Sequence, residues 1–180
     1  MYSNFPFLPV NSVSAGKRTS VYGIGINDAN YVVNPSVDGV KFTCPIYRMW
    51  VAMFKRCYSG SSLSLRPSYV GCTVDERWHS FMAFREWVLA QPEWEGRQLD
   101  KDLLAENNKV YGPDTCIFIT HRLNSFLATS HSNNSGLPIG VKKFRKKFVA
   151  HSTNLDGSRW ESFPVFTMDE AYSLYLKHKR

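Results

Sequence analysis

The sequence of 180 residues contains no long hydrophobic run. A helix that crosses a bilayer needs roughly 20 consecutive apolar residues, so we expect no membrane-spanning segment and no membrane partner. Residues 1–13 have no basic patch ahead of their apolar positions and no small-residue cleavage site, which argues against a secretory signal peptide. We therefore expect a soluble, cytoplasmic protein.

Cysteine is scarce, and its spacing does not match a structural zinc motif. The four cysteines are Cys44, Cys57, Cys72 and Cys116. No C-x-x-C or H-x-x-x-H pair accompanies them, and a structural zinc site normally draws on such pairs. The cysteines could still meet in the fold and bind a metal, but buried thiols are the better prediction for a reducing compartment.

The signatures of two common enzyme classes are also missing. The pair Gly23 and Gly25 lacks the third glycine and the following helix of a phosphate-binding loop. No local motif supports a serine or cysteine nucleophile triad.

The residues that are present favour a folded α+β protein. Hydrophobic residues make up 43% and aromatic residues 14% of the chain, which is enough for a core and argues against a disordered chain. From changes in composition along the chain we expect four parts: a flexible arm over 1–20, a mixed module over 21–130, a linker over 131–137 and a small module over 138–180.

Two helices are predicted in the first half. Residues 45–58 begin with a proline suited to a first helical turn, and Ile46, Trp50, Met53 and Cys57 fall on one stripe. Residues 80–90 carry a second stripe, formed by Phe81, Phe84, Trp87 and Val88. At helical spacing these aromatic side chains are expected in the core rather than in a base-stacking surface.

The second half favours strands followed by helices. Residues 99–104 and 116–119 are expected to be extended, and Thr120 is suited to cap a helix that follows. After the linker, residues 139–142, 147–151 and 160–165 alternate as three strands. The sequence from Thr167 to Glu170 is a capping box that predicts a final helix.

The charge is concentrated at the C-terminal end. The chain carries 22 lysines and arginines against 15 acidic residues, and residues 136–180 hold nine of the basic and four of the acidic ones. Such an end suggests a polyanionic partner, most often nucleic acid, although a solvated, solubilising face remains open.

The run from Lys142 to Lys147 is the strongest binding signal. If it is extended, Lys143, Arg145 and Lys147 lie on one side, and Arg159 and Trp160 are expected on the same face. The residues expected to contact DNA are Lys142, Lys143, Arg145, Lys146, Lys147 and Arg159. Lysines dominate, so phosphate contacts and modest sequence preference are expected.

Several short sequence segments occur in an order and with a spacing that resemble those of a known family. They are WVAM (50–53), RCY (56–58), YVGCTV (69–74), ERW (76–78), the aromatic run 81–87, LDKD (99–102), NK (108–109), YGPDTC (111–116), ITHRLN (119–124), GV (140–141) and FTMDEA (166–171). Together they resemble bacteriophage HNH-endonuclease-like proteins of the homing-endonuclease type. The last two, with the basic strand between them, resemble the small DNA-binding domain shared with plant ethylene-response factors, which often follows the HNH module in phage proteins.

This resemblance implies a degenerate HNH module (ββα-metal) followed by a three-stranded sheet and helix. In such modules a carboxylate and an amide oxygen hold one divalent cation against the scissile phosphate. The resemblance places Mg²⁺ or Mn²⁺ on Asp100 and Asn124, with Asn108 organising the loop. Double-stranded DNA is the implied partner, and the host-cell cytoplasm is the implied location if a phage encodes the chain.

One position departs from the family pattern. Lys101 stands where the homing enzymes have the histidine that acts as a base. Beside a phosphate a lysine keeps its charge, so it can bind the scissile phosphate but is a poor base. His121 is a second candidate base, but its position at the start of a predicted helix is unfavourable for that role. The alternative interpretation of Asp100 and Asp102 is that they have no functional role and are simply acidic residues on an exposed strand or turn edge.

Three functions therefore remain open. The first is a phage-type DNA-binding protein that also acts as a metal-dependent endonuclease or nickase. The second is a catalytically inactive DNA-binding regulator. The third is a host-takeover or anti-defence protein that binds a host protein.

Overall fold

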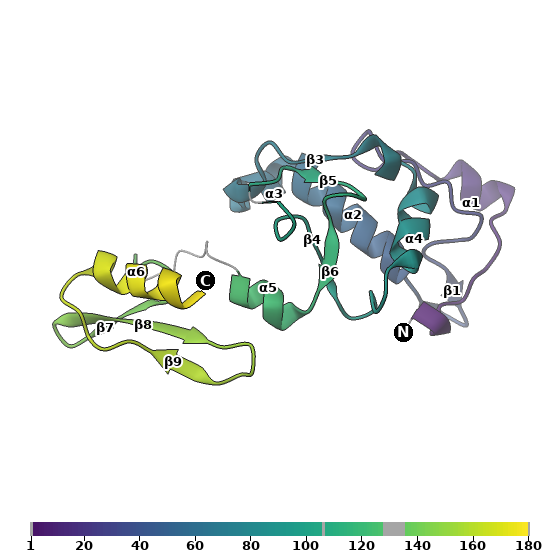
Figure 1. The fold of residues 1–180 in the computed structure, drawn as a ribbon. Helices are drawn as coiled ribbons and strands as arrows, with labels where there is room; N and C mark the ends of the chain where they lie inside the picture. Colours follow the sequence, from purple (N-terminus) through teal and green to yellow (C-terminus); the bar gives the residue numbers. More distant parts are fainter. Residues whose placement is uncertain (1, 106, 128–135, 180) are drawn as a thin grey trace. The chain divides into compact units, whose positions relative to one another are not determined.

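The computed structural model describes residues 2–105, 107–127 and 136–179. The protein is α+β, with short strands in small sheets (Figure 1). It forms two compact units, Met1–Phe118 and Ile119–Arg180. The boundary thus comes earlier than the expected one at 130, and most of the expected linker lies outside the described residues. Within the described ranges, no helix has the length and apolar character needed to cross a membrane.

The first unit is built from short elements around two longer helices. In chain order they are η1 (Tyr2–Asn4), α1 (Ser12–Gly16), β1 (Ser36–Val37), β2 (Val40–Lys41), α2 (Pro45–Tyr58), α3 (Gly60–Leu65), η2 (Pro67–Tyr69), β3 (Thr73–Val74), η3 (Glu76–Trp78), α4 (Phe81–Ala90), β4 (Gln98–Asp100), β5 (Val110–Tyr111) and β6 (Ile117–Ile119), whose last residue lies beyond the boundary. β1 pairs with β2 antiparallel, β3 with β5 parallel, and β4 with β6.

The core of this unit lies between α2 and α4. The predicted stripe of α2 is confirmed, because Ile46, Trp50, Met53 and Cys57 are all buried. The Trp50 indole Nε1 donates to the main-chain oxygen of Trp78 at 2.7 Å, so its polar atom is satisfied within the core. α4 begins after Ser80, whose hydroxyl accepts from the main-chain N–H of Ala83 at 3.1 Å.

The segment 2–20, expected to be a flexible arm, packs against the first unit. Phe5 is buried, and Pro9 forms a β-bridge with Tyr31. The Arg18 guanidinium donates to the main-chain oxygen of Ala29 at 2.6 Å. The polar composition of this segment predicts a flexible arm, but its few aromatic residues are enough to anchor it to the rest of the unit.

The second unit is a three-stranded antiparallel sheet with helices. Its elements are α5 (His121–Leu127), β7 (Val141–Phe144), β8 (Lys147–Thr153), β9 (Arg159–Glu161) and α6 (Met168–Lys179), and the strand order is β7-β8-β9. The capping box before α6 is confirmed, since Thr167 and Glu170 exchange hydrogen bonds at 3.2 Å in both directions. The predicted three strands and final helix are therefore present.

The helix α6 covers one face of this sheet (Figure 1). Gly140 has φ +73°, and a Cβ there would lie 2.0 Å from the Tyr175 ring of α6, so only glycine allows this close approach. Trp160 of β9 stacks on His178 of α6 with ring centres 3.9 Å apart. Among the described residues of this unit, no helix covers the opposite face of the sheet.

Candidate nucleic-acid interface

The loop after β4 holds three of the residues that the resemblance assigns to a nuclease site. Asp100 ends β4, and its Oδ1 accepts from the main-chain N–H groups of Asp102 at 2.9 Å and Leu103 at 2.8 Å. A carboxylate with these bonds turns the chain sharply after the strand. The side chain of Asp100 therefore has a local structural role in this loop.

Lys101 points into the protein rather than toward solvent. Its side chain is 5% exposed. The ammonium donates to the main-chain oxygen of Asn108 at 2.7 Å and to Asp102 Oδ1 at 2.5 Å, and it lies 5.9 Å from the centre of the Tyr111 ring. We expected this lysine to bind a scissile phosphate. In the structure the Lys101 ammonium is bound by groups of its own loop.

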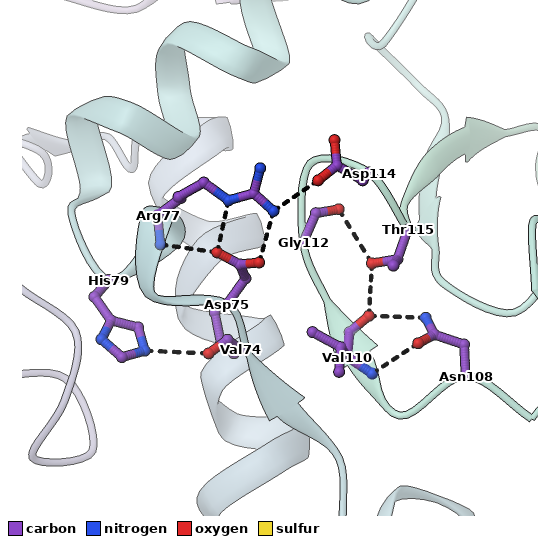
Figure 2. Close-up of polar contacts among 9 residues, drawn as sticks. All are labelled: Val74, Asp75, Arg77, His79, Asn108, Val110, Gly112, Asp114 and Thr115. Atoms are coloured by element: carbon purple, nitrogen blue, oxygen red, sulfur yellow. Dashed lines mark hydrogen bonds and ion pairs between the residues drawn. The ribbon is translucent and has the colours of Figure 1, made fainter.

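Asn108 holds the far end of the same loop (Figure 2). Its amide nitrogen donates to the main-chain oxygen of Lys101 at 2.7 Å. The same nitrogen donates to the main-chain oxygen of Val110 at 2.8 Å, and Asn108 Oδ1 accepts from the Val110 N–H at 3.0 Å. The Thr115 hydroxyl donates to the same Val110 oxygen at 2.8 Å. The loop is thus closed on itself by side-chain to main-chain bonds.

A second polar group in Figure 2, not identified from the sequence, fixes the turn after β5. Arg77 bridges two carboxylates, with nitrogen–oxygen distances of 2.8 Å to Asp75 and 2.7 Å to Asp114. Hydrogen bonds from Arg77 lower the pKa of Asp75 to about 2. The short spacing of Asp75 and Arg77 is a signal for a local pair, but Asp114 is remote in sequence, so spacing alone does not reveal the bridge.

The remaining nuclease candidates belong to the second unit. His121 and Asn124 lie on α5, which Thr120 caps by accepting from the Leu123 N–H at 3.2 Å, as predicted. Asp100 and Asn124, the expected ligands of Mg²⁺ or Mn²⁺, thus come from different units. Within residues 2–105, 107–127 and 136–179, no three His, Cys, Asp or Glu side chains form a group able to hold a metal ion.

The cysteines are buried thiols in the structure. All four are free and buried. Burial raises the pKa of Cys57 and of Cys116 to about 12, so these thiols stay protonated at neutral pH and are poor nucleophiles.

The basic run is not one extended strand but a hairpin. β7 ends at Phe144, β8 begins at Lys147, and these two residues are directly paired. Arg145 and Lys146 form the turn, with Arg145 at φ 55°. The expected alignment of Lys143, Arg145 and Lys147 on one side is therefore wrong, because the chain reverses between them.

The register decides which basic residues share a face. Lys147 lies opposite Phe144, and Lys142 is two residues before Phe144, so all three are on one face. Arg159 pairs with Thr153, six residues after Lys147, and lies on the same face. This is the face that α6 leaves uncovered, and we call it the open face.

Two expected members of this face lie elsewhere. Lys143 pairs with Phe148, and both point to the side of the sheet that carries α6. Trp160 also points to that side, where it stacks on His178. Trp160 and its neighbour Arg159 therefore lie on opposite faces, contrary to the prediction, because successive strand residues alternate.

Charge on the open face is partly balanced. The Lys142 ammonium pairs with Glu161 across the sheet. Arg145, Lys146 and Arg159 are exposed, as is Lys143 near the sheet edge. The least compensated positive charge therefore gathers at the β7–β8 turn and at Arg159.

No model of a known protein family, no curated protein and no solved structure matches this chain.

Proposed function

We propose that this protein binds double-stranded DNA through its C-terminal unit. The observation that carries the proposal is the exposed basic hairpin on a sheet whose open face is not covered by any helix among the described residues of its unit. Arg145 and Lys146 project at the turn, and Lys142, Lys147 and Arg159 follow along the open face. Basic side chains on a narrow antiparallel ribbon suit the phosphates that border a DNA groove.

The residue types favour contacts to phosphate over reading of bases. Lysine is a flexible point charge that binds phosphate in many geometries, whereas the planar guanidinium of arginine is better suited to bidentate recognition of guanine. Arg159, at the end of the sheet away from the hairpin turn, is the candidate base-reading residue on the open face. We therefore propose salt-sensitive binding with modest sequence preference.

A metal-dependent nuclease is the second candidate, and the resemblance to HNH proteins supports it. In that case Asp100 and Asn124 would hold Mg²⁺ or Mn²⁺, and the cation would supply Lewis-acid activation of water for phosphodiester hydrolysis. The bonding of Lys101 and Asn108 within their own loop favours binding without cleavage, since neither side chain is directed to a substrate in this arrangement.

A plasmid assay tests both candidates. Supercoiled plasmid is incubated with the purified protein at low salt in Mg²⁺, Mn²⁺ or EDTA, beside the variant Asp100→Ala. A shifted but intact plasmid in every lane is the expected result. Nicked or linear product that needs metal and is lost in the variant would establish the nuclease instead. No shift at low salt would refute DNA binding and leave an interaction with a host protein.

A further inference from the structure

Two exposed aromatic rings flank a lysine on the open face of the sheet. Phe144 is 47% and Phe166 75% exposed. Phe144 and Lys147 are directly paired between β7 and β8. Phe148 and Val165 form a β-bridge on the other side of β8, and Lys147 and Phe166 are the next residues along. Phe144, Lys147 and Phe166 therefore form one row across three adjacent segments.

Cations lie against both rings of this row. The Lys147 ammonium is 4.2 Å from the centre of the Phe166 ring. The Arg145 guanidinium is 5.7 Å from the centre of the Phe144 ring. The row thus presents apolar flat surfaces and positive charge at the same place, beside the basic turn. Single exposed apolar residues are common on protein surfaces, but two exposed rings in one row, each with a cation against it, are a more specific arrangement.

This combination fits one class of ligand. Nucleic acid carries negative phosphates beside flat bases, and an aromatic ring stacks on any base whose face is free. In a regular duplex both faces of each base are covered by neighbouring bases. A protein ring reaches a base face only where a base is unpaired, or where the ring itself opens a base step.

We propose that Phe144 and Phe166 hold an unstacked base, while Lys147 and the β7–β8 turn bind the phosphates beside it. The preferred ligand is then duplex DNA that contains an unpaired nucleotide. The inference rests on the proposed DNA binding and narrows its substrate class. It explains why Phe144 and Phe166 are exposed beside the basic residues, which phosphate contacts alone do not explain.

The test compares two short labelled duplexes that differ by one unpaired adenine. Their affinities for the full-length protein are measured by fluorescence anisotropy at fixed low salt. The wild type is expected to bind the bulged duplex about tenfold more tightly, the order expected for stacking of one base. The double variant Phe144→Leu/Phe166→Leu is expected to lose this preference and keep its affinity for the regular duplex.

A matched control is Leu155→Ala, which removes an exposed apolar side chain, 49% exposed, from the turn that follows β8. It is expected to leave both affinities unchanged. Equal binding of the two duplexes by the wild type, or a preference that survives in the double variant, would overturn the inference while DNA binding stands. Failure to bind either duplex would overturn the proposed function and the inference together.

Discussion

The two units use the same kinds of residue in opposite ways. In the first unit Lys101 is buried and bound by its own loop, and the aromatic residues of α2 and α4 form the core. In the second unit Lys147 lies on the open face between two exposed phenylalanine rings. Lysine and aromatic residues thus stabilise the fold in one unit and lie on the open face of the sheet in the other.

The arginines follow the same division. Arg77 of the first unit is held between two carboxylates, Asp75 and Asp114. In the second unit Arg145 stands at a turn, and among the residues that the structure describes neither it nor Lys146 forms an ion pair. A charge already matched inside the protein adds little to binding, whereas an unmatched one attracts a polyanion. Function is therefore expected where the charge is unmatched.

The comparison predicts its largest effect for two tryptophan substitutions. Trp50→Ala removes a fully buried ring and its hydrogen bond, and we expect a loss of about 3–5 kcal/mol in the free energy of unfolding. Trp160→Ala removes only the stack on His178 beside a small sheet, and we expect about 1 kcal/mol. Urea titration followed by circular dichroism measures both. Equal losses would show that the second unit has a core of comparable importance.

A second prediction concerns the basic hairpin. Arg145→Ala/Lys146→Ala/Lys147→Ala should weaken DNA binding at low salt and reduce the slope of log affinity against log salt by about 3 if each residue meets one phosphate. The matched control neutralises three exposed lysines of the first unit, Lys17, Lys41 and Lys55, with the same change in net charge. Equal effects of the two triple variants would mean that only net charge matters and that no interface exists.

A third prediction separates a structural from a substrate-binding lysine. Lys101→Met should lower the free energy of unfolding by about 1–3 kcal/mol, because the main-chain oxygen of Asn108 loses its donor, and should leave DNA affinity unchanged. The control Lys109→Met alters an exposed lysine of the same loop and should change stability by less than about 0.5 kcal/mol. A stable Lys101→Met protein with weaker DNA binding would instead place this lysine at the substrate.

The smallest effect is expected from pH. Because Arg77 lowers the pKa of Asp75 to about 2, the charged carboxylate stabilises the fold above the unfolded-state pKa of about 3.9, and this contribution is lost as the pH falls toward 2. Thermal melts between these pH values should show a loss of stability that is reduced in Asp75→Asn. The effect is small because the Arg77 side chain is exposed and Asp75 is only partly buried, so solvent screens the pair. An identical acid dependence in the variant would assign that loss to other carboxylates.

Much of the fold follows from patterns in the sequence. The stripe of Ile46, Trp50, Met53 and Cys57 predicts α2, and the box from Thr167 to Glu170 predicts the start of α6. Both signals are local, since a helix repeats its buried positions every three or four residues and its first turn needs a cap.

The arrangement of the candidate site could not be predicted in the same way. The hairpin at Arg145 and Lys146 has no glycine, asparagine or aspartate, the usual residues of a tight turn, so the sequence does not indicate that the chain reverses there. Lysine is rarely buried, and nothing near Lys101 in the sequence indicates that the main-chain oxygen of Asn108 will accept a hydrogen bond from its ammonium. The row formed by Phe144 and Phe166 depends on strand register, which the sequence alone does not specify.

The central claim is that DNA binds to the second unit. It is tested most directly by mapping which lysines DNA protects from acetylation. The full-length protein is treated with acetic anhydride at low salt, with and without a short duplex, and modified residues are quantified by mass spectrometry. The account predicts that DNA protects Lys142, Lys146 and Lys147 and leaves Lys41 and Lys55 equally reactive. Protection confined to lysines of the first unit would contradict it.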